Sequence, residues 1–283
     1  MPPKWTWAAA ALILVAGLAS AVIAGDNDTP SLTEHDYDFH GHELYMQFQK
    51  DKNTKAAEIW QEGLRKFPNS PLLHARLGWY YWERAFDGWS DSPKVDFQKA
   101  EELAKEALAY QKVTPLVEQL SHGLLAHVDA QKGDFNKALK ETELAIAANR
   151  HEVYIKADIA HLLNMANLAE EALNWSDQEI ARDPPNKKWY LYNKGHALTL
   201  LGKPEQAIET LKRAENWINT SGYLAINYVR LKKLAEAKAE VERLLTRDPE
   251  FTTNIWREIT PYRDREVLDN ELLDLAKAGL PEK

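Results

Sequence analysis

The chain has 283 residues, of which 45% are hydrophobic and 28% charged, and its formal net charge at pH 7 is −8. Such an acidic chain is not expected to take nucleic acid or anionic lipid as its main partner, because both are negatively charged themselves. The sequence contains no cysteine, which excludes disulfides, thiolate nucleophiles and cysteine-ligated metals.

Residues 1–24 have the pattern of a segment that directs export. Lys4 precedes an apolar run that extends from Ala8 to Ala24, and Ala19-Ser20-Ala21 supplies the small residues that a signal peptidase prefers. The run has about the minimum length for a membrane-spanning helix. We expect a cleaved signal peptide, with an uncleaved membrane anchor as the alternative. The protein would then be periplasmic, or anchored in the inner membrane and facing the periplasm, and would meet the membrane only through such an anchor.

Residues 25–41 are polar and acidic, and we expect them to form a linker. The histidines His35, His40 and His42 lie among acidic residues, which together could bind a divalent ion weakly. Their spacing matches no closed metal site, so a solvated tail is the favoured interpretation.

Helical periodicity then fills residues 42–250, and no segment alternates as a strand would. Gly, Pro, Asn and Asp separate the periodic stretches, as in Gly133-Asp134 and Gly202-Lys203-Pro204. The sequence therefore predicts an all-α fold. The expected helix pairs are 42–50 with 54–66, 71–86 with 94–111, 115–132 with 135–148, 152–165 with 169–181, 187–201 with 204–217, and 221–231 with 234–246.

One phrase recurs in these pairs, and its copies are Leu77-Gly78-Trp79, Leu125-Ala126-His127, Ile159-Ala160-His161 and Lys194-Gly195-His196. A small residue that anchors the second helix follows each copy, for example Ala138, Ala172 and Ala207. This pattern, with a period of about 34 residues, resembles the tetratricopeptide repeat. The resemblance implies an α-solenoid of about six helix pairs.

A narrower resemblance rests on the segment Gly88-Trp89-Ser90-Asp91-Ser92-Pro93 and on the ending Lys277-Ala278-Gly279-Leu280-Pro281-Glu282. Both are similar to the carboxy-terminal tetratricopeptide region of alphaproteobacterial adenylate-cyclase-like and winged-helix regulator proteins. No cyclase or DNA-binding domain precedes the repeats here, so the resemblance implies the scaffold and not the catalysis.

Two segments depart from the repeat. The insertion from Ala85 to Phe97 lengthens the second unit, and Trp89 is expected either to pack beneath this loop or to close over a ligand. Residues 251–283 contain two short apolar helices interrupted by Pro261. The second helix, about Arg265 to Ala278, is expected to cap the last repeat, with docking of a partner as the alternative.

The repeated phrase also predicts a binding surface. In tetratricopeptide arrays the first helix of each unit lines the concave face, so the resemblance places one side chain per unit along a groove. The candidate groove residues are Trp79, Trp82, His127, Tyr154, His161, Asn164, Trp189, Tyr192 and His196. Inner helices about 8–10 Å apart hold imidazoles too far apart to share an ion easily, so no metal and no cofactor is expected.

One interpretation is that this groove accepts an extended or helical peptide and responds to pH near 6.5, the ordinary pKa of histidine. The alternative is that these positions only tolerate polar residues because they face water. Catalysis finds no support, because the sequence lacks a nucleophile elbow, a zinc-protease motif, a phosphate loop and a dinucleotide fingerprint. The expected function is thus that of an exported, non-enzymatic scaffold for a protein or peptide. The alternative is a periplasmic small-molecule or metal sensor that uses the same histidines and aromatic residues.

Overall fold

A computed structural model describes residues 31–148, 154–182, 187–214 and 218–282, and within these ranges it contains helices and no strand. The all-α prediction is confirmed. The helices are α2 (Glu34–Tyr45), α3 (Lys50–Lys66), α4 (Pro71–Phe86), α5 (Pro93–Leu108), α6 (Pro115–Gln131), α7 (Phe135–Ala148), α8 (Tyr154–Met165), α9 (Ala169–Arg182), α10 (Lys187–Leu200), α11 (Pro204–Leu211), α12 (Ile218–Arg230), α13 (Leu234–Arg247), α14 (Thr253–Ile259) and α15 (Arg265–Ala278).

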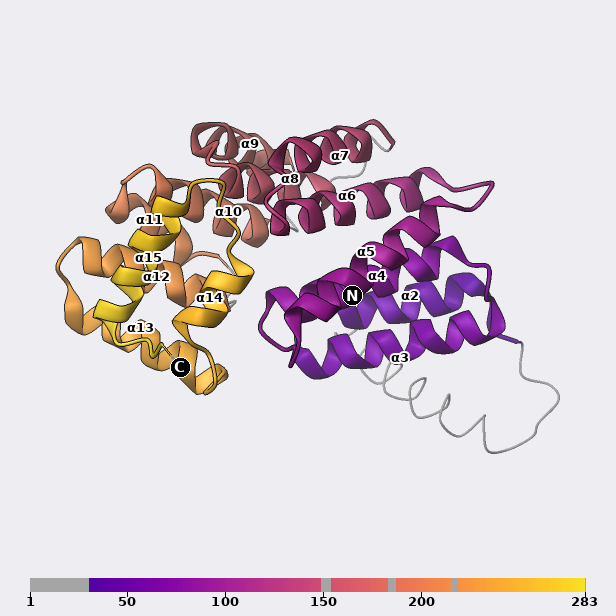
Figure 1. Cartoon of the computed structure of the whole chain (residues 1–283), viewed down its shortest axis with the longest axis horizontal. Coiled ribbons are helices and arrows are strands. Elements are labelled where there is room, and N and C mark those ends of the chain that lie inside the picture. Colours follow the sequence, from indigo (N-terminus) through magenta and orange to yellow (C-terminus); the bar gives the residue numbers. More distant parts are fainter. Residues whose placement is uncertain (1–30, 149–153, 183–186, 215–217, 283) are drawn as a thin grey trace, which may run out of the picture.

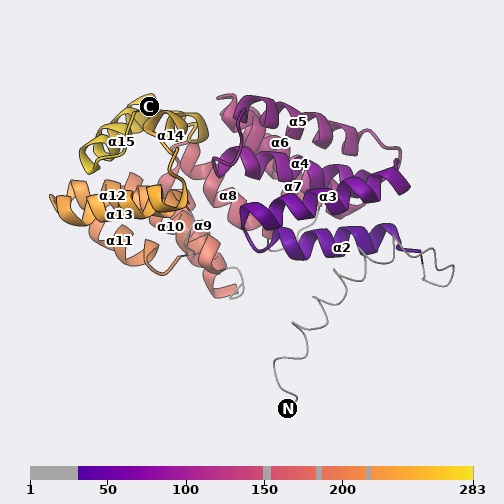
Figure 2. The same cartoon turned by 90° about the horizontal axis from the view of Figure 1, so that it is seen from below.

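Consecutive helices pack as hairpins, and the hairpins stack side by side. The first helices of the pairs form an inner layer in which α4 packs on α6, α6 on α8, α8 on α10 and α10 on α12. The second helices form the outer layer. The array curves into an arch, with α2–α5 on one side, α6–α9 across the top and α10–α15 on the other side (Figure 1). The same two sides face each other when the molecule is seen from below (Figure 2).

Small residues set how closely the helices approach. The anchor alanines Ala56, Ala100 and Ala207 are fully buried. A Cβ atom added at Gly78 would lie 2.6 Å from Leu124, and one added at Gly195 would lie 2.5 Å from Leu211. Real Cβ contacts are not that short, so the small residue of the repeated phrase is a packing requirement. It fixes the rotation of each inner helix and thereby the direction of the residue that follows.

The array begins earlier than the sequence indicates. Helix α2 starts at Glu34, where Thr33 forms a capping box with Asp36. Asp38 lies 2.6 Å from the guanidinium Nε of Arg76, and Tyr37 is buried against the first hairpin. The predicted linker is therefore wrong for residues 34–41, because one ion pair and one buried ring dock this polar segment on α4. Residues 1–24, predicted to direct export, lie outside the described residues, and no helix in the described part is long and apolar enough to cross a membrane.

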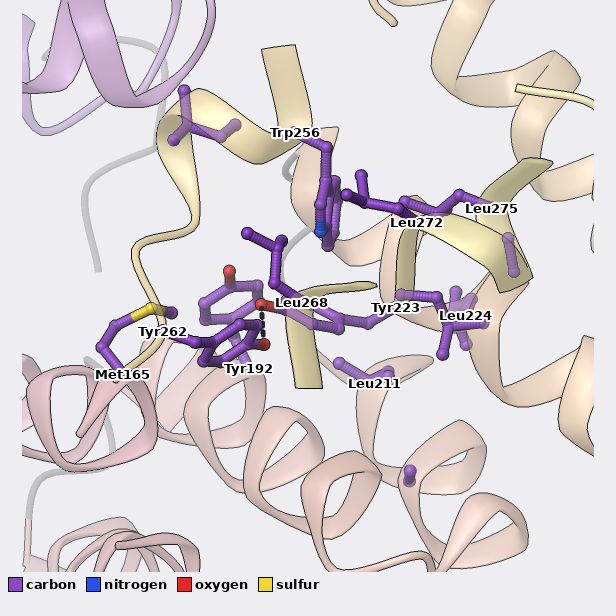
Figure 3. Close-up of a cluster of buried hydrophobic side chains, with 14 of the residues drawn as sticks. Met165, Tyr192, Leu211, Tyr223, Leu224, Trp256, Tyr262, Leu268, Leu272 and Leu275 are labelled. Carbon is purple, nitrogen blue, oxygen red and sulfur yellow. Dashed lines mark hydrogen bonds between the residues drawn. The ribbon is translucent and has the colours of Figure 1, made fainter. Parts of the chain in front are cut away.

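In the carboxy-terminal segment, α15 packs against α12 and α13. The segment also returns along the inner face. Trp256 packs over Gly222, and Tyr262 inserts among Tyr192, Tyr223 and Leu268 (Figure 3). Beyond them the backbone N–H of Arg263 donates to the carbonyl of Met165 at 2.9 Å. The inner face of the last repeats is consequently filled by the chain itself.

The long connection between α4 and α5 is ordered by its own contacts. Arg84 donates from Nε and an Nη atom to both carboxylate oxygens of Asp96, at 2.7 and 2.8 Å, and its carbonyl accepts from the N–H of Trp89. Gly88 has a positive φ of 72°, and a Cβ there would lie 3.5 Å from Asp248 and from Phe251. The connection therefore meets the start of the carboxy-terminal segment. Trp89 is only partly buried.

Candidate functional site

A cavity lies on the inner face between the two sides of the arch. Its volume is about 500 Å³, part of which is open to solvent. The lining consists of aromatic side chains, three carboxylates and one amide. The lining residues are Tyr45, Phe48, Trp79, Trp82, Glu83, Phe86, Asp87, Asp158, Trp189, Tyr192 and Asn219.

Two aromatic pairs form the walls. On α4, Trp82 and Phe86 stack with ring centroids 4.7 Å apart and planes within 13°, because residues four apart share one face of a helix. On α10, Trp189 and Tyr192 stack at 5.1 Å within 8°. Each wall exposes ring faces that carry partial negative charge. The predicted groove residues Trp79, Trp82, Trp189 and Tyr192 all line this cavity.

The histidines of the repeated phrase form a ladder that joins these walls. His127 lies 5.5 Å from Trp79 and 5.5 Å from His161, and His161 lies 6.5 Å from His196, all measured between ring centroids. His161 also contacts Phe86 at 5.3 Å and Trp189 at 5.9 Å. Trp79, His127, His161 and His196 each follow the small residue of the repeated phrase. They therefore do lie along one side of the array. They are buried among rings rather than exposed in an open groove.

Burial changes what these histidines can do. Loss of solvent lowers the pKa of His161 to about 4, and the same cause lowers the pKa of His127 well below its usual value. Both imidazoles are therefore neutral at pH 6.5, and the predicted response of these groups near that pH is wrong. In the described part of the chain, no cluster of three His, Asp or Glu residues could hold a metal ion.

Three carboxylates enter the cavity from two helices. Glu83 and Asp87 follow Trp79 at successive intervals of four residues on α4, so all three share one face. Asp158 comes from α8, and its Oδ1 accepts a hydrogen bond from Trp189 Nε1 at 3.2 Å. Glu83 Oε2 accepts from Asn53 Nδ2 at 3.0 Å, and the hydroxyl of Tyr45 also forms a hydrogen bond with this carboxylate. The other oxygens, Glu83 Oε1 and Asp158 Oδ2, are buried without a hydrogen-bond partner among the described residues.

The buried surroundings of these carboxyl groups raise their pKa values. Burial raises the pKa of Asp158 to about 7. Burial also raises the pKa of Asp87 to about 7, although Arg247 opposes the change. The pKa of Glu83 is raised well above its usual value by burial and then by the charge of Asp87. Buried acidic groups with unsatisfied oxygens are costly, and such sites are candidates for function.

Phe48 and Trp189 mark the mouth of the cavity, because they are the lining residues with intermediate exposure and the others are buried. Phe48 lies in the turn between α2 and α3 and has a positive φ of 50°. This left-handed conformation costs about 1–2 kcal/mol for a residue with a Cβ. The turn thus holds a phenyl ring at the mouth in a conformation that glycine would adopt more easily.

His127 and His161 of the ladder are not among the lining residues, two further predicted residues do not line the cavity either, and one is not described. Asn164 is fully buried and donates from Nδ2 to the carbonyl of Asn193 at 3.0 Å, which ties α8 to α10. His196 stacks on Tyr223 at 4.3 Å, and its Nε2 lies 2.5 Å from the hydroxyl of Tyr262. The side chain of Tyr154 lies outside the described residues. The carboxylates and Phe48 were not predicted from the sequence, although one signal was present: Glu83 directly follows a run of aromatic residues on α4.

Comparison with known proteins agrees with this architecture. A tetratricopeptide-repeat family model matches residues 190–220. A tetratricopeptide repeat protein from Parabacteroides merdae has a similar structure, with a TM-score of 0.54 at 12% identity over 92% of this chain and 89% of that one. PilW, a type IV pilus biogenesis factor, has a TM-score of 0.52 at 13% identity over 84% of this chain and 100% of that one. No curated protein matches the sequence.

The fold and the stacked hairpins define an α-solenoid. Within that class, the tetratricopeptide-repeat model matches most of α10, all of α11 and the start of α12. The predicted fold class is confirmed.

Proposed function

We propose that this protein is an exported, non-enzymatic scaffold that recognises a protein or peptide partner at the inner-face cavity. The observation that carries the proposal is the arrangement of aromatic side chains from α2, α4 and α10 around one space with an open mouth. Aromatic rings that line a concave site supply much of the binding energy in protein recognition.

The mode of binding differs from the extended groove expected from the sequence. The carboxy-terminal segment covers the inner face at α10 and α12, where Tyr262 is 1% exposed. An extended peptide along the whole inner face would have to displace this segment. A partner that inserts a single side chain through the mouth at Phe48 and Trp189 needs no such displacement.

The signal-like residues 1–24 support export, and the net charge of −8 argues against a nucleic-acid partner. We also propose that this chain is related to the repeat region of the adenylate-cyclase-like regulators. Its support is the pair of sequence segments at residues 88–93 and 277–282. The mass of the mature chain in a periplasmic fraction tests export, because cleavage near Ala21 removes the apolar run.

Site-directed photo-crosslinking in the native cells tests the binding surface. A photoreactive amino acid replaces Phe48 at the mouth, and a matched control replaces Leu234, which is 49% exposed on the outer helix α13. Crosslinks to one defined protein from position 48, and none from position 234, support the proposal. Crosslinks from position 234 alone would move the binding surface to the outer layer.

The enclosure of the cavity favours a second candidate, a sensor of a small molecule. Most of the lining is buried, and the free space suits a small group better than a folded surface. Ligand binding to the folded state alone raises the melting temperature. A thermal-shift screen of the purified chain against metabolites would detect such a ligand without any protein partner.

A further inference from the structure

We infer that the inner-face cavity binds an organic ammonium group, either as a free amine or as a lysine side chain, between the aromatic walls and the carboxylates Glu83 and Asp158. The inference deepens the proposed function, because it names the chemistry of the group that enters the mouth. It stands on the lining, the unpartnered oxygens and the distribution of charge.

The lining combines the two features that recognise ammonium groups. Ring faces attract a cation within about 6 Å of their centroids, most strongly for tryptophan and when water is excluded. Trp79 and Trp82 lie 5.5 Å apart between centroids on one side, and the stacked Trp189 and Tyr192 form the other. A group that fits between these walls touches aromatic carbon on its methylene or methyl surfaces.

The carboxylates supply acceptors that the protein does not use. Glu83 is 3% exposed and Asp158 is 6% exposed, yet Glu83 Oε1 and Asp158 Oδ2 lack hydrogen-bond partners within the described ranges. An ammonium group has up to three N–H donors and no acceptor, so it complements a pair of unused oxygens. Such charge-assisted hydrogen bonds are about twice as strong as neutral ones.

The charge of the lining favours a positively charged ligand. Among the described lining residues, Glu83, Asp87 and Asp158 are the carboxylic acids, and none is a lysine or an arginine. Arg247, at the end of α13, acts on Asp87 from outside the lining. When these acids ionise, as a bound cation favours, their negative charge exceeds the positive charge of the one nearby guanidinium. An anionic ligand would meet repulsion here.

Binding of a cation also changes the protonation of the carboxyl groups in the site. A bound ammonium favours the ionised carboxylates, so binding releases protons and strengthens as the pH rises from 6 to 8. The titratable and charged groups packed around the cavity are Tyr45 from α2, Glu83 and Asp87 from α4, His127 from α6, Asp158 and His161 from α8, Tyr192 from α10 and Arg247 from α13. The histidines are already neutral in this window, which leaves the acids to set the trend.

The test is a titration of the purified chain, followed by tryptophan fluorescence and calorimetry. The probes are tetramethylammonium, free lysine amide, a Gly-Gly-Lys-Gly-Gly peptide and the same peptide with an acetylated lysine. We expect the cationic probes to bind and the acetylated peptide to bind at least about tenfold more weakly, since acetylation removes the charge. Peptide binding about tenfold tighter than that of the free amines identifies a lysine of a partner as the source. Equal or tighter binding of a free amine identifies a small molecule.

Isosteric variants locate the site. Glu83→Gln and Asp158→Asn each remove one charge with little change of shape, and each is expected to weaken amine binding about tenfold or more. The matched control is Glu179→Gln, a carboxylate on α9 that is 1% exposed and does not line the cavity, and it should leave the affinity unchanged.

Equal binding of the charged and acetylated peptides, no binding of any cationic probe, or unchanged affinity in both cavity variants would overturn the inference. None of these results involves the cellular partner. Crosslinking at position 48 tests the scaffold function independently. Failure of the ammonium site and failure of the scaffold function are therefore distinguishable.

Discussion

The two halves of the inner face use the same repeat position in opposite ways. At α4 and α8 the aromatic residues surround a cavity in which Glu83 and Asp158 each keep one unpartnered oxygen. At α10 and α12 the space is filled by the carboxy-terminal segment. There both oxygens of Glu271 are used, since Oε1 accepts from the Tyr262 hydroxyl at 2.9 Å and Oε2 from Trp256 Nε1 at 3.2 Å.

The comparison shows that the repeat pattern determines where a side chain points but not what that side chain does. His161 and His196 occupy equivalent positions, yet His161 contacts the walls of the cavity and His196 contacts Tyr262. What decides between them is coverage by a segment distant in sequence. A buried acid whose two oxygens both have partners, as in Glu271, is structural, whereas an acid with an unused oxygen is a candidate for ligand binding.

The largest effect is expected from Trp256→Ala, which tests whether the filled half depends on the carboxy-terminal segment. Trp256 is fully buried and packs over Gly222. Truncation of a buried tryptophan to alanine costs about 3–5 kcal/mol of the free energy of unfolding. Urea unfolding measures the loss. A loss below about 1 kcal/mol would mean that the last repeats hold together without this segment.

The next effect compares the two polar clusters directly. Tyr262→Phe leaves Glu271 and His196 without their shared partner, which should lower the free energy of unfolding by about 1–3 kcal/mol. Asp158→Asn at pH 8 should leave it unchanged or raise it, because the amide oxygen still accepts from Trp189 and a buried charge is removed. Equal losses in the two variants would contradict the distinction between a structural and a binding cluster.

The pH dependence of stability is expected to come from the same acids. Asp87, Asp158 and Glu271 each have a pKa of about 7, raised by burial, so the folded chain binds more protons than the unfolded chain between pH 4 and pH 7. Stability supplied by such groups falls as the pH rises. His161 has a lowered pKa of about 4 and acts oppositely below pH 6.5, but it is neutral in both states above that pH.

The urea midpoint should therefore fall from pH 6.5 to pH 8. The free energy of unfolding should decrease over this range by about 1 kcal/mol for each carboxyl group. Asp158→Asn should flatten the curve. A midpoint that rises over this range would show that the acids are not held protonated by the fold.

The smallest effect is expected where the two halves meet. Gly88→Ala introduces a side chain at a φ of 72°, which costs about 1–2 kcal/mol. The added Cβ has ordinary contacts of 3.5 Å with Asp248 and Phe251, so no further clash is expected. Gly202→Ala is the matched control, because Gly202 has a similar φ of 65° with nothing within 4 Å of the added Cβ. Equal losses in the two variants assign the cost to the backbone alone, and a larger loss at Gly88 assigns the excess to the junction.

The sequence predicted the elements that depend on local spacing. Small residues such as Gly78 and Gly195 repeat at a regular period, and they fix which way Trp79 and His196 point. Helix α15 was predicted from Arg265 to Ala278, and the structure has these bounds. Such features follow from residues within one or two turns of each other.

Features that depend on distant contacts were not predictable. Tyr262 lies 66 residues from His196 in the sequence, and nothing near either residue indicates their contact. The docking of α2 likewise depends on an ion pair between Asp38 and Arg76. In the sequence, the acids of the cavity cannot be distinguished from solvent-exposed acids, because their burial depends on the fold. The aromatic neighbours of Glu83 were nevertheless a usable signal.

The meeting of the α4–α5 connection with residues Asp248 and Phe251 has a consequence for how the molecule folds and opens. An open solenoid makes contacts only between adjacent repeats, and it can fray from either end. Here an early segment rests on a late one, so loop-closure entropy for most of the chain must be overcome before the contact forms. We expect the end repeats to unfold together with the middle ones in a single cooperative transition, and native folding to be completed only after the last helices have been synthesised.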